Sequence, residues 1–424
     1  MTKKREVFIV DGARSPFLKV TGKPNPLSAA DLAVAVTGPL LARQPFLSHH
    51  IGEVITGCVG PASDEANIAR IIALRSGCGD KVPAWTVQRN CASGLQALAA
   101  AAIDIANGDY DLVLAGGTEC MSRAPLIYQN RLVEWLADFR TRKGLMAKIQ
   151  TLFKLRPQFL TPVISLLNAL TDPVVNLSMG QTAENLVYQF QISREAADAF
   201  SVASHQRAVD ALKNGLLKEI IPIFDWQGNV VDSDTGIRGD ASLEKLAGLK
   251  PVFDKPFGSV TAGNSSQITD GAAFLILASE SAIKRHRLPV LAKIIDTEWA
   301  ALDPALMGLG PRYAIQKLLT KNHLQLDDID YWEINEAFAS QVLACLKALE
   351  QENIGKIPLD RLNVDGGAVA IGHPVGATGA RLVLHLVHVL ARNKAKYGVA
   401  SLCIGGGQGG AMLIERVTEI VKHG

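Results

Sequence analysis

The alternation of short apolar segments with alanine- and leucine-rich segments occurs twice along this chain, and it constrains the fold more than any other feature. In the first part, the pattern predicts a helix at residues 95–106 and strands at 6–10, 53–58, 84–87 and 111–115. It returns near residue 270, with predicted helices at 312–321 and 338–349 and strands at 272–278, 292–296, 329–334 and 398–403. Such alternation is typical of α/β folds, so the chain looks like a duplicated α/β unit.

The two halves carry matching turns that are rich in glycine. The turn around Cys91 opens a helix of small residues that leads to a strand at 112–115. In the second half, residues 363–375 lead through two glycines into a helix at 381–390, and then to strand 398–403 and the glycines at 405–407. Turns at the carboxyl ends of strands bind ligands in α/β sheets, so we expect both turns to meet at one cleft. The alternative is two independent α/β domains in tandem.

Size and composition narrow the class of protein. The 424 residues are 48% hydrophobic and 20% charged, which is enough for large cores, and the net charge of +2 gives no reason to expect a nucleic-acid partner. The apolar stretch near the start ends at Asp11, and no run reaches about 18 apolar residues, so we expect a soluble, cytoplasmic protein. The six cysteines form no CxxC pair, which favours reduced thiols and no metal site.

The segment at 122–250 differs in composition from its flanks and is predicted to be an inserted loop or cap domain. The predicted halves are then residues 1–121 with about 251–270, and residues 271–424. Within the insert, residues 131–156 hold seven basic and two acidic residues together with apolar residues at helical spacing. Packing of this amphipathic stretch onto its own protein is the favoured interpretation, and contact with an anionic membrane surface or a partner is the alternative.

Cys91 and Cys403 are the candidate reactive groups. Cys91 follows the apolar segment at 84–87 and precedes a helix, whose free N–H groups and dipole would lower the thiol pKa. Cys403 ends a strand and runs into three glycines, a turn suited to an oxyanion pocket. The same glycines can cradle a phosphate, but no complete βαβ unit follows them. The other four cysteines are expected to be buried or half-buried apolar residues, at 58, 78, 120 and 345.

Two further side chains complete the candidate set. His373 lies between Gly372 and Pro374 on an irregular backbone, where a neutral ring can accept a thiol proton or donate to a substrate oxygen. Asn335 follows the apolar segment at 329–334 and precedes a helix. Its amide can cap that helix or can fix a water or a substrate oxygen. Two thiols and a histidine can together break a carbon–carbon bond beside a carbonyl.

Four motifs in this order resemble those of the thiolases: Asn90-Cys91-Ala92-Ser93-Gly94, Asn335-Glu336-Ala337-Phe338, Gly372-His373-Pro374 and Cys403-Ile404-Gly405-Gly406-Gly407. The similarity also covers residues 11–16, 179–185 and 261–266. It implies the thiolase fold, in which two βαβαβαββ halves form α-β-α-β-α layers with an inserted loop domain. It implies an acyltransferase whose substrates are coenzyme A (CoA) and 3-oxoacyl-CoA, with no permanently bound cofactor.

The resemblance also assigns roles. Cys91 is the nucleophile that takes up the acyl group, His373 activates it, and Cys403 is the acid and base. Asn335, through a water, and His373 meet the enolate oxygen, while the backbone N–H groups of Cys91 and Gly405 meet the acyl oxygen. For CoA, the resemblance implies that Arg238 stacks on the adenine and that Ser266 lies near the pantetheine arm.

The insert at 126–178 is longer than in short-chain thiolases and resembles the thiolase subunit of the fatty-acid oxidation multienzyme complex. This implies a degradative role on medium- or long-chain substrates, a homodimer or homotetramer, a partner subunit with enoyl-CoA hydratase and 3-hydroxyacyl-CoA dehydrogenase activities, and membrane-surface contact through residues 131–156. A biosynthetic acetoacetyl-CoA thiolase is the alternative. Rivals of other kinds are a ketosynthase, a papain-like hydrolase that uses Cys91, His373 and Asn335, and a non-catalytic CoA- or lipid-binding scaffold.

Overall fold

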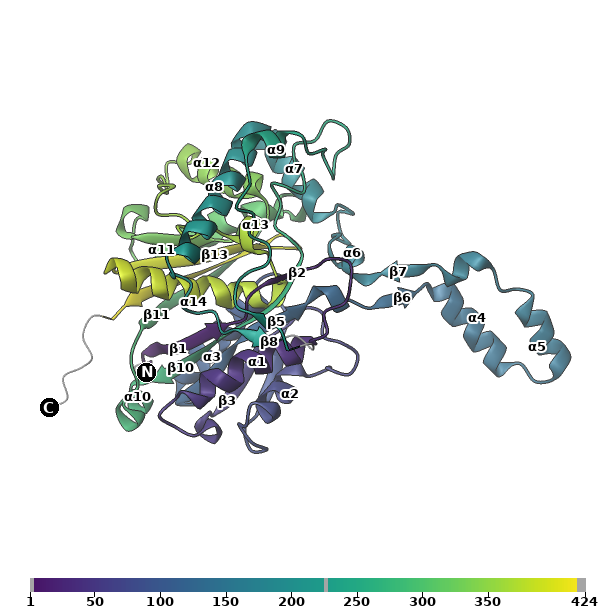
Figure 1. Ribbon diagram of the computed structural model, residues 1–424, viewed down its shortest axis with the longest axis horizontal. Helices are drawn as coiled ribbons and strands as arrows, with labels where there is room; N and C mark the ends of the chain where they lie inside the picture. The colour runs from purple at the N-terminus through teal and green to yellow at the C-terminus, as the bar shows by residue number, and fades with distance from the viewer. Residues whose placement is uncertain (1–3, 225–227, 418–424) are drawn as a thin grey trace.

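The computed structural model describes residues 4–224 and 228–417, and most of its strands form one long sheet with two related halves (Figure 1). The first half has the strand order β4-β3-β5-β10-β1. Its strands are β1 (Val7–Arg14), β3 (Glu53–Gly57), β4 (Ala84–Val87), β5 (Leu112–Cys120) and β10 (Thr269–Ser279). Strand β3 is parallel to β4 and β5, whereas β10 is antiparallel to β5 and β1. The short β2 (Leu18–Lys19) pairs with β10.

Counted outward from the junction of the two halves, the second half has the order β11-β14-β13-β12, which corresponds to β1-β10-β5-β3 in the first half. Its strands are β11 (Ala292–Ala301), β12 (Tyr331–Ile334), β13 (Tyr397–Ile404) and β14 (Gln408–Arg416). An isolated parallel bridge from Trp332 to Leu362 stands where β4 stands in the first half. The two halves join through three residue pairs between β1 and β11. The predicted duplication is therefore present as a repeated strand order.

One predicted strand belongs to the other half. The sequence interpretation placed residues 272–278 at the start of the second half, but β10 pairs with β5 and β1 of the first. The reason is that β10 is buried along its whole length between these two strands, a position that its uninterrupted apolar run suits. The sheet of the first half thus ends at Ser279 and not near residue 270.

Helices cover the sheet in three layers. The outer helices of the first half are α1 (Ala29–Ala42) and α2 (Ile68–Arg75), and those of the second are α11 (Gly310–Lys321) and α12 (Ala339–Gln351). Between the two half-sheets lie α3 (Ser93–Asn107) and α14 (Val375–Asn393), whose apolar side chains share one core with strands of both halves. The predicted α-β-α-β-α layering is confirmed. Further helices after the insert are α10 (Glu280–His286) and α13 (Ala368–Ile371).

The two central helices approach each other through glycines. A Cβ on Gly94 of α3 would lie 2.7 Å from the Gly376 carbonyl oxygen, and one on Gly379 of α14 would lie 2.4 Å from the Leu95 nitrogen. Gly376 and Gly379 were predicted to precede a helix, but they lie in the first turns of α14. Glycine is used here because the backbones of α3 and α14 leave no room for a side chain.

The insert covers one edge of the molecule and sends out an arm. Its elements are β6 (Leu126–Tyr128), α4 (Asn130–Thr141), α5 (Leu145–Leu152), β7 (Pro162–Ile164), α6 (Ser165–Ala169), α7 (Met179–Phe190), α8 (Arg194–Lys213), β8 (Ile223–Phe224), β9 (Val230–Val231) and α9 (Leu243–Ala247). Strands β6 and β7 pair as a stalk, and α4 and α5 project from it away from the body (Figure 1). We call residues 126–164 the arm.

The arm contradicts the expectation that its amphipathic stretch packs onto the body. Trp135 and Phe139 stack within the arm, and the Trp135 indole donates to the Thr151 carbonyl at 2.8 Å. Other apolar side chains stay in solvent, and Leu145 and Phe153 are 78% and 85% exposed. The body offers this stripe no surface because the β6–β7 stalk holds the helices apart from it. Within the described part of the chain, no helix has both the length and the apolar character needed to cross a membrane.

Candidate active site

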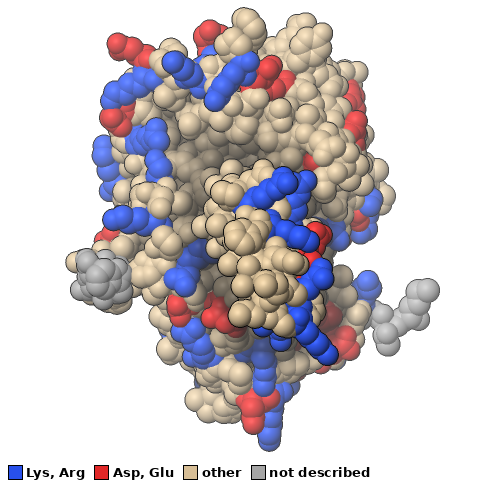
Figure 2. All heavy atoms as spheres, turned by 90° about the vertical axis from the view of Figure 1, so that its right-hand side faces the viewer, with Lys and Arg blue, Asp and Glu red and all other residues tan. Residues whose placement is uncertain are grey.

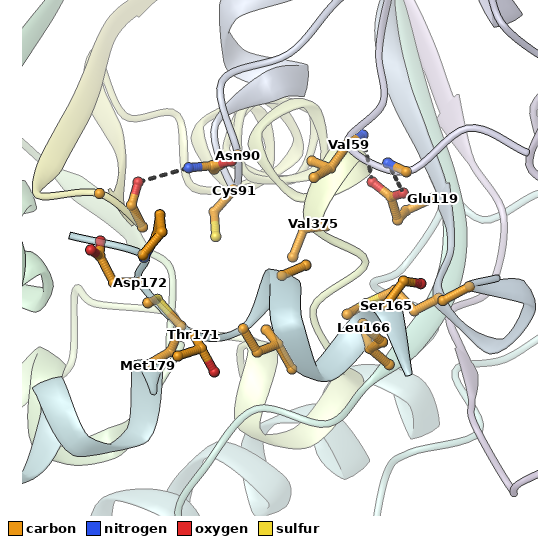
Figure 3. A pocket seen from close by; sticks show the side chains of 18 of the residues that line it. Val59, Asn90, Cys91, Glu119, Ser165, Leu166, Thr171, Asp172, Met179 and Val375 are labelled. Atoms are coloured by element: carbon orange, nitrogen blue, oxygen red, sulfur yellow. Dashed lines mark hydrogen bonds between the residues drawn. The ribbon is translucent and has the colours of Figure 1, made fainter. Parts of the chain in front are cut away.

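Cys91 lies in the short turn between β4 and α3, as the sequence predicted. The preceding residue, Asn90, has a left-handed backbone with φ of 43°, which an asparagine tolerates better than most residues. Its amide donates to the Gly405 carbonyl at 2.8 Å (Figure 3). Gly405 begins the turn between β13 and β14, so this bond ties the Cys91 turn of the first half directly to the Cys403 turn of the second.

The local environment of Cys91 differs from the expectation of an acidic thiol. Burial raises the pKa of the Cys91 thiol above its ordinary value, and the charge of Glu119 raises it further. The backbone N–H groups of Gly405 and of Cys91 itself act in the opposite direction without overcoming burial. The thiol is therefore protonated at neutral pH, and it needs a base to become a nucleophile.

Cys403 is the penultimate residue of β13 (Tyr397–Ile404) and is almost completely buried, at 1% exposure. Burial raises the pKa of its thiol well above the ordinary value, and the sulfurs of Cys91 and Cys345 add to that rise. The hydrogen bond from Asn90 to Gly405 holds the turn that carries Cys91 against the turn that follows Cys403. A buried, protonated thiol can donate a proton to a developing carbanion.

His373 is held between two partners that determine its tautomer. Its Nδ1 lies 2.7 Å from the Thr378 hydroxyl, and that hydroxyl donates to the Pro374 carbonyl at 3.0 Å. The Thr378 oxygen must then accept a hydrogen bond from Nδ1–H, which leaves Nε2 as the acceptor nitrogen of the ring, beside the Asn335 amide. Burial lowers the pKa of His373 to about 3, and the Arg381 charge contributes. The ring is thus neutral at physiological pH and able to act as a base.

Asn335 is fully buried beside this histidine. Its Nδ2 lies 3.4 Å from His373 Nε2, and its Oδ1 has no partner among the described residues. It does not cap the following helix, because α12 begins at Ala339 with Phe338 as its N-cap. An amide oxygen without a partner in a buried site calls for a water or a ligand atom, which favours the second of the two roles that the sequence left open.

Cys91 opens into an apolar cavity of about 440 Å³, which we call the Cys91 cavity (Figure 3). Its wall comes from the Cys91 and Gly405 turns, from the loop after β3, and from the base of the arm. It is lined mainly by Val59, Pro61, Met121, Ala124, Pro125, Leu166, Ala169, Leu170, Pro173, Val174, Met179 and Val375. Two acidic residues, Glu119 and Asp172, also line it, and no lysine, arginine or histidine of the described residues does.

A second cavity of about 520 Å³ adjoins the first, and we call it the Arg238 cavity. It brings together three residues that the sequence singled out, Arg238, Ser266 and His373. Two basic residues also line it, Arg238, which is exposed, and Lys19, which is half-buried. The two cavities share five lining residues, Met121, Leu170, Thr171, Met179 and Val375. Cys403 and Asn335 line neither cavity, since both are buried behind the walls.

Sequence reasoning missed several residues of this site. Lys19 lies on a two-residue strand with no motif around it. Thr378 lies five residues after His373, between Gly376 and Gly379, so a search for a partner of the histidine ring could have found it. Glu119 is a lone acidic residue in an otherwise apolar segment, which is a signal for a buried functional carboxylate. The remaining cysteines are buried, as expected.

Comparison with known proteins identifies the family. The family model for the thiolase N-terminal domain matches residues 7–281, and that for the thiolase C-terminal domain matches residues 288–416. The chain belongs to the thiolase family. This thiolase is thus an acyltransferase, and the junction of the two family domains agrees with the end of β10 at Ser279.

Individual relatives of this thiolase have different names. It is 38% identical to the β subunit of the mitochondrial trifunctional enzyme of Bos taurus, over 97% of this chain and 88% of the relative. It is 40% identical to a β-ketoadipyl-CoA thiolase of Acinetobacter baylyi, over 97% and 100%. The crystal structure of human mitochondrial 3-ketoacyl-CoA thiolase in complex with CoA superimposes with a TM-score of 0.87 at 37% identity, covering 98% of both chains.

Proposed function

We propose that this thiolase cleaves 3-oxoacyl-CoA with CoA, releasing acetyl-CoA and an acyl-CoA shortened by two carbons, and that its acyl chain is a neutral fatty chain of medium or long length. The observation that carries this proposal is the contrast between the two adjoining cavities. The Arg238 cavity is lined by Lys19 and Arg238, which can bind the CoA phosphates. The Cys91 cavity is apolar and holds no basic side chain among the described residues.

The Cys91 cavity has no basic side chain among the described residues, and this distinguishes acyl chains that end in a carboxylate from neutral acyl chains as substrates. A β-ketoadipyl chain ends in a carboxylate, which would lie near Glu119 and Asp172 with no partner for its charge. Burying an unpaired carboxylate costs several kcal/mol. A fatty chain instead gains about 0.8 kcal/mol for each buried CH₂ group. The cavity therefore favours a fatty chain.

The reaction begins with the transfer of a proton from the Cys91 thiol to Nε2 of His373, and the unprotonated state of Nε2 in this tautomer supports the role. The thiolate attacks the 3-keto carbon of the substrate and forms a tetrahedral adduct. The bond between carbons 2 and 3 then breaks, and its electron pair stays on carbon 2 as the acetyl-CoA enolate. The acyl group remains on Cys91 as a thioester.

Cys403 gives its thiol proton to carbon 2 of the enolate, which completes acetyl-CoA. The Cys403 thiolate next takes a proton from a new CoA molecule, whose sulfur attacks the acyl-Cys91 thioester. When this second adduct collapses, the Cys91 thiolate recovers its proton from His373. Both cysteines and the histidine thus return to their starting states, and no cofactor is consumed.

Two sets of donors face the oxygens that become negative. The N–H groups of Cys91 and Gly405 are directed toward the Cys91 sulfur, which supports their role toward the acyl oxygen. His373 and a water on the unpartnered Asn335 Oδ1 serve the enolate oxygen. The resemblance implies that Ser266 and Arg238 contact CoA, and both line the cavity that we assign to it. One donor of this kind is worth about 2.7–4 kcal/mol in the transition state.

The substrate class is tested by a CoA-dependent cleavage assay on 3-oxoacyl-CoAs of graded length. We expect kcat/KM to rise roughly threefold for each added CH₂ until the cavity is full, and to be at least about 100-fold lower for 3-oxoadipyl-CoA than for a neutral chain of equal length. The Leu166→Trp variant fills the cavity from α6 and should shift the optimum to shorter chains.

Leu160→Trp is the matched control, because Leu160 is an exposed residue of the arm that lines neither cavity. Its chain-length profile should equal that of the unmodified enzyme. A flat profile, or one restricted to acetoacetyl-CoA, would contradict the fatty-chain proposal. The latter result would favour the biosynthetic alternative, in which the same residues condense two acetyl-CoA molecules. We propose the degradative direction because the condensation of two acetyl-CoA molecules does not require a large apolar cavity.

The arm supports a second part of the proposal, contact with an anionic membrane surface. Residues 131–156 carry a net charge of +5, from seven basic and two acidic residues, whereas the whole chain carries only +2. Seen end-on, the arm shows uncharged side chains, in tan, bordered by basic side chains, in blue (Figure 2). Leu145, Met146 and Phe153 are 78%, 73% and 85% exposed. This pairing of apolar and basic side chains fits the interface of a lipid bilayer with anionic headgroups.

Vesicle sedimentation tests the membrane contact. We expect the enzyme to bind phosphatidylglycerol vesicles at least about tenfold better than phosphatidylcholine vesicles, because each basic residue near the surface adds about 1 kcal/mol. The double variant Leu145→Asp with Phe153→Asp should lose most of this binding and keep its activity on soluble substrates. Tyr188→Asp, at an 88% exposed position on α7 outside the arm, is the control. Equal binding to both vesicle types, or full binding by the double variant, would contradict the contact.

We also propose how the enzyme assembles with other subunits. One relative is named as a subunit of a trifunctional enzyme. By analogy, we propose a homodimer or homotetramer that joins a partner subunit with enoyl-CoA hydratase and 3-hydroxyacyl-CoA dehydrogenase activities. The substrate supplied by such a partner is the 3-oxoacyl-CoA that this site uses.

A further inference from the structure

Glu119 is a buried carboxylate in the wall of the Cys91 cavity that the mechanism above does not use. It lies near the end of β5 in the first half and is 3% exposed. Its Oε2 accepts a hydrogen bond from the Val59 N–H, and its Oε1 accepts one from the Gly60 N–H, both at 2.9 Å (Figure 3). The Cys58 thiol lies 3.8 Å from Oε1. These donors all belong to the loop that follows β3.

The same carboxylate reaches the other half of the molecule. It lies against the backbone of Gly376, in the first turn of α14, and the Gly376 N–H acts to lower the Glu119 pKa. The contact is so close that a Cβ on Gly376 would lie 2.7 Å from Glu119 Oε2 and 2.4 Å from the Thr118 carbonyl oxygen. A negative charge at a helix N-terminus stabilises that end of the helix, here by a side chain from the opposite half.

The start of α14 is the segment that carries the histidine. His373 lies three residues before Gly376, and its Nδ1 partner Thr378 is part of α14 itself. Val375 lies between His373 and Gly376 in the sequence, and it lines the same cavity as Glu119 and Cys91 (Figure 3). A shift of the first turn of α14 therefore moves the ring of His373 relative to the Cys91 sulfur.

We propose that Glu119 is a positioning residue for the thiolase reaction. Its carboxylate joins the loop after β3 to the first turn of α14 and so fixes His373 relative to Cys91. The inference rests on the proposed roles of these two residues. A glutamine in its place keeps the shape but presents an NH₂ group to one of the backbone N–H donors, which leaves that buried donor unpaired.

The charge of Glu119 gives a readout that a purely structural role would not change. Burial raises the pKa of Glu119 to about 7, so the carboxylate is largely ionised above neutral pH. Its negative charge raises the pKa of the Cys58 and Cys91 thiols, and the charge of Glu65 also raises the pKa of Cys58. Removing its charge should therefore make the Cys91 thiol more acidic while turnover becomes slower.

The test compares Glu119→Gln with the unmodified enzyme in two assays. We expect kcat, per folded active site, to fall at least tenfold with the KM for CoA changed less than twofold. We expect alkylation of Cys91 by iodoacetamide, followed by mass spectrometry, to become roughly threefold faster or more at pH 8. Glu119→Asp keeps the charge but is one CH₂ shorter, so it should lower kcat without speeding alkylation.

Glu65→Gln is the matched control, because Glu65 is also a buried carboxylate that accepts a backbone N–H, from Ala30 at 3.1 Å, and it lines neither cavity. Its kcat and alkylation rate should stay within twofold of the unmodified enzyme. Unchanged kcat in Glu119→Gln, or a loss explained by the folded fraction with unchanged alkylation, would overturn the inference. Failure of the proposed function gives a different result, since an unmodified enzyme without thiolysis can still be alkylated at Cys91.

Discussion

Replacement of Cys91 by alanine is expected to lower kcat for the cleavage of a 3-oxoacyl-CoA by about 10⁴- to 10⁶-fold, since loss of a nucleophile removes the covalent route as a whole. Cys403→Ala should behave differently. The first proton transfer and the attack by Cys91 remain possible in this variant. The acyl-Cys91 thioester should therefore accumulate, and mass spectrometry should detect it. The two cysteines thus have separable signatures.

Cys78→Ala is the control for both cysteine variants, because Cys78 is a free, buried cysteine that lines neither cavity. Its kcat should remain close to that of the unmodified enzyme. Activity that survives Cys91→Ala would remove the proposed nucleophile. An acyl group found on Cys403 in place of Cys91 would reverse the two roles.

The second large effect is expected on stability, from His385→Leu. His385 of α14 lies between two buried carboxylates, with Nδ1 2.9 Å from Glu219 and Nε2 2.9 Å from Asp365. Despite burial, these carboxylates raise the pKa of His385 to about 10, so the ring is a cation at neutral pH. Leucine would leave both carboxylates without this partner. Breaking a buried ion pair in this way costs about 3–5 kcal/mol in the free energy of unfolding.

The raised pKa of His385 also predicts how its contribution to the free energy of unfolding changes with pH. The pKa of His385 is higher in the folded chain than its ordinary value of 6.5, so its contribution is complete below pH 6.5 and is lost as pH rises through about 10. Urea unfolding should therefore show a large difference between His385→Leu and the unmodified enzyme at pH 6, and a smaller one at pH 10. His388→Leu, one turn away without a carboxylate in ion-pair range among the described residues, should cost much less. Equal losses for both variants would contradict the argument.

Local sequence patterns predicted the parts of this fold that depend on neighbouring residues. The strand at 84–87, the helix that follows Cys91 and the turn that follows Cys403 all appear where propensity and glycine placed them. Pairing between distant strands is not encoded locally, which is why the strand at 272–278 was assigned to the wrong half. The projecting arm was unpredictable for the same reason, since an amphipathic pattern does not specify what covers its apolar face.

The candidate site shows the same division. Motifs singled out Cys91, His373 and Asn335, and the structure brings the last two within 3.4 Å of each other. The pKa of the Cys91 thiol was predicted to be lowered and is instead raised, because burial outweighs the backbone N–H groups that stabilise the thiolate. Glu119 and Thr378 escaped notice because their importance comes from partners rather than from a motif.

The bond from the Asn90 amide to the Gly405 carbonyl has a consequence for biosynthesis. The segment that carries Gly405 is synthesised long after the one that carries Asn90, because the two belong to different halves of the fold. A nascent polypeptide that does not yet include β13 and β14 holds the Cys91 turn without this bond. The turn reaches its final geometry only after the second half has been synthesised.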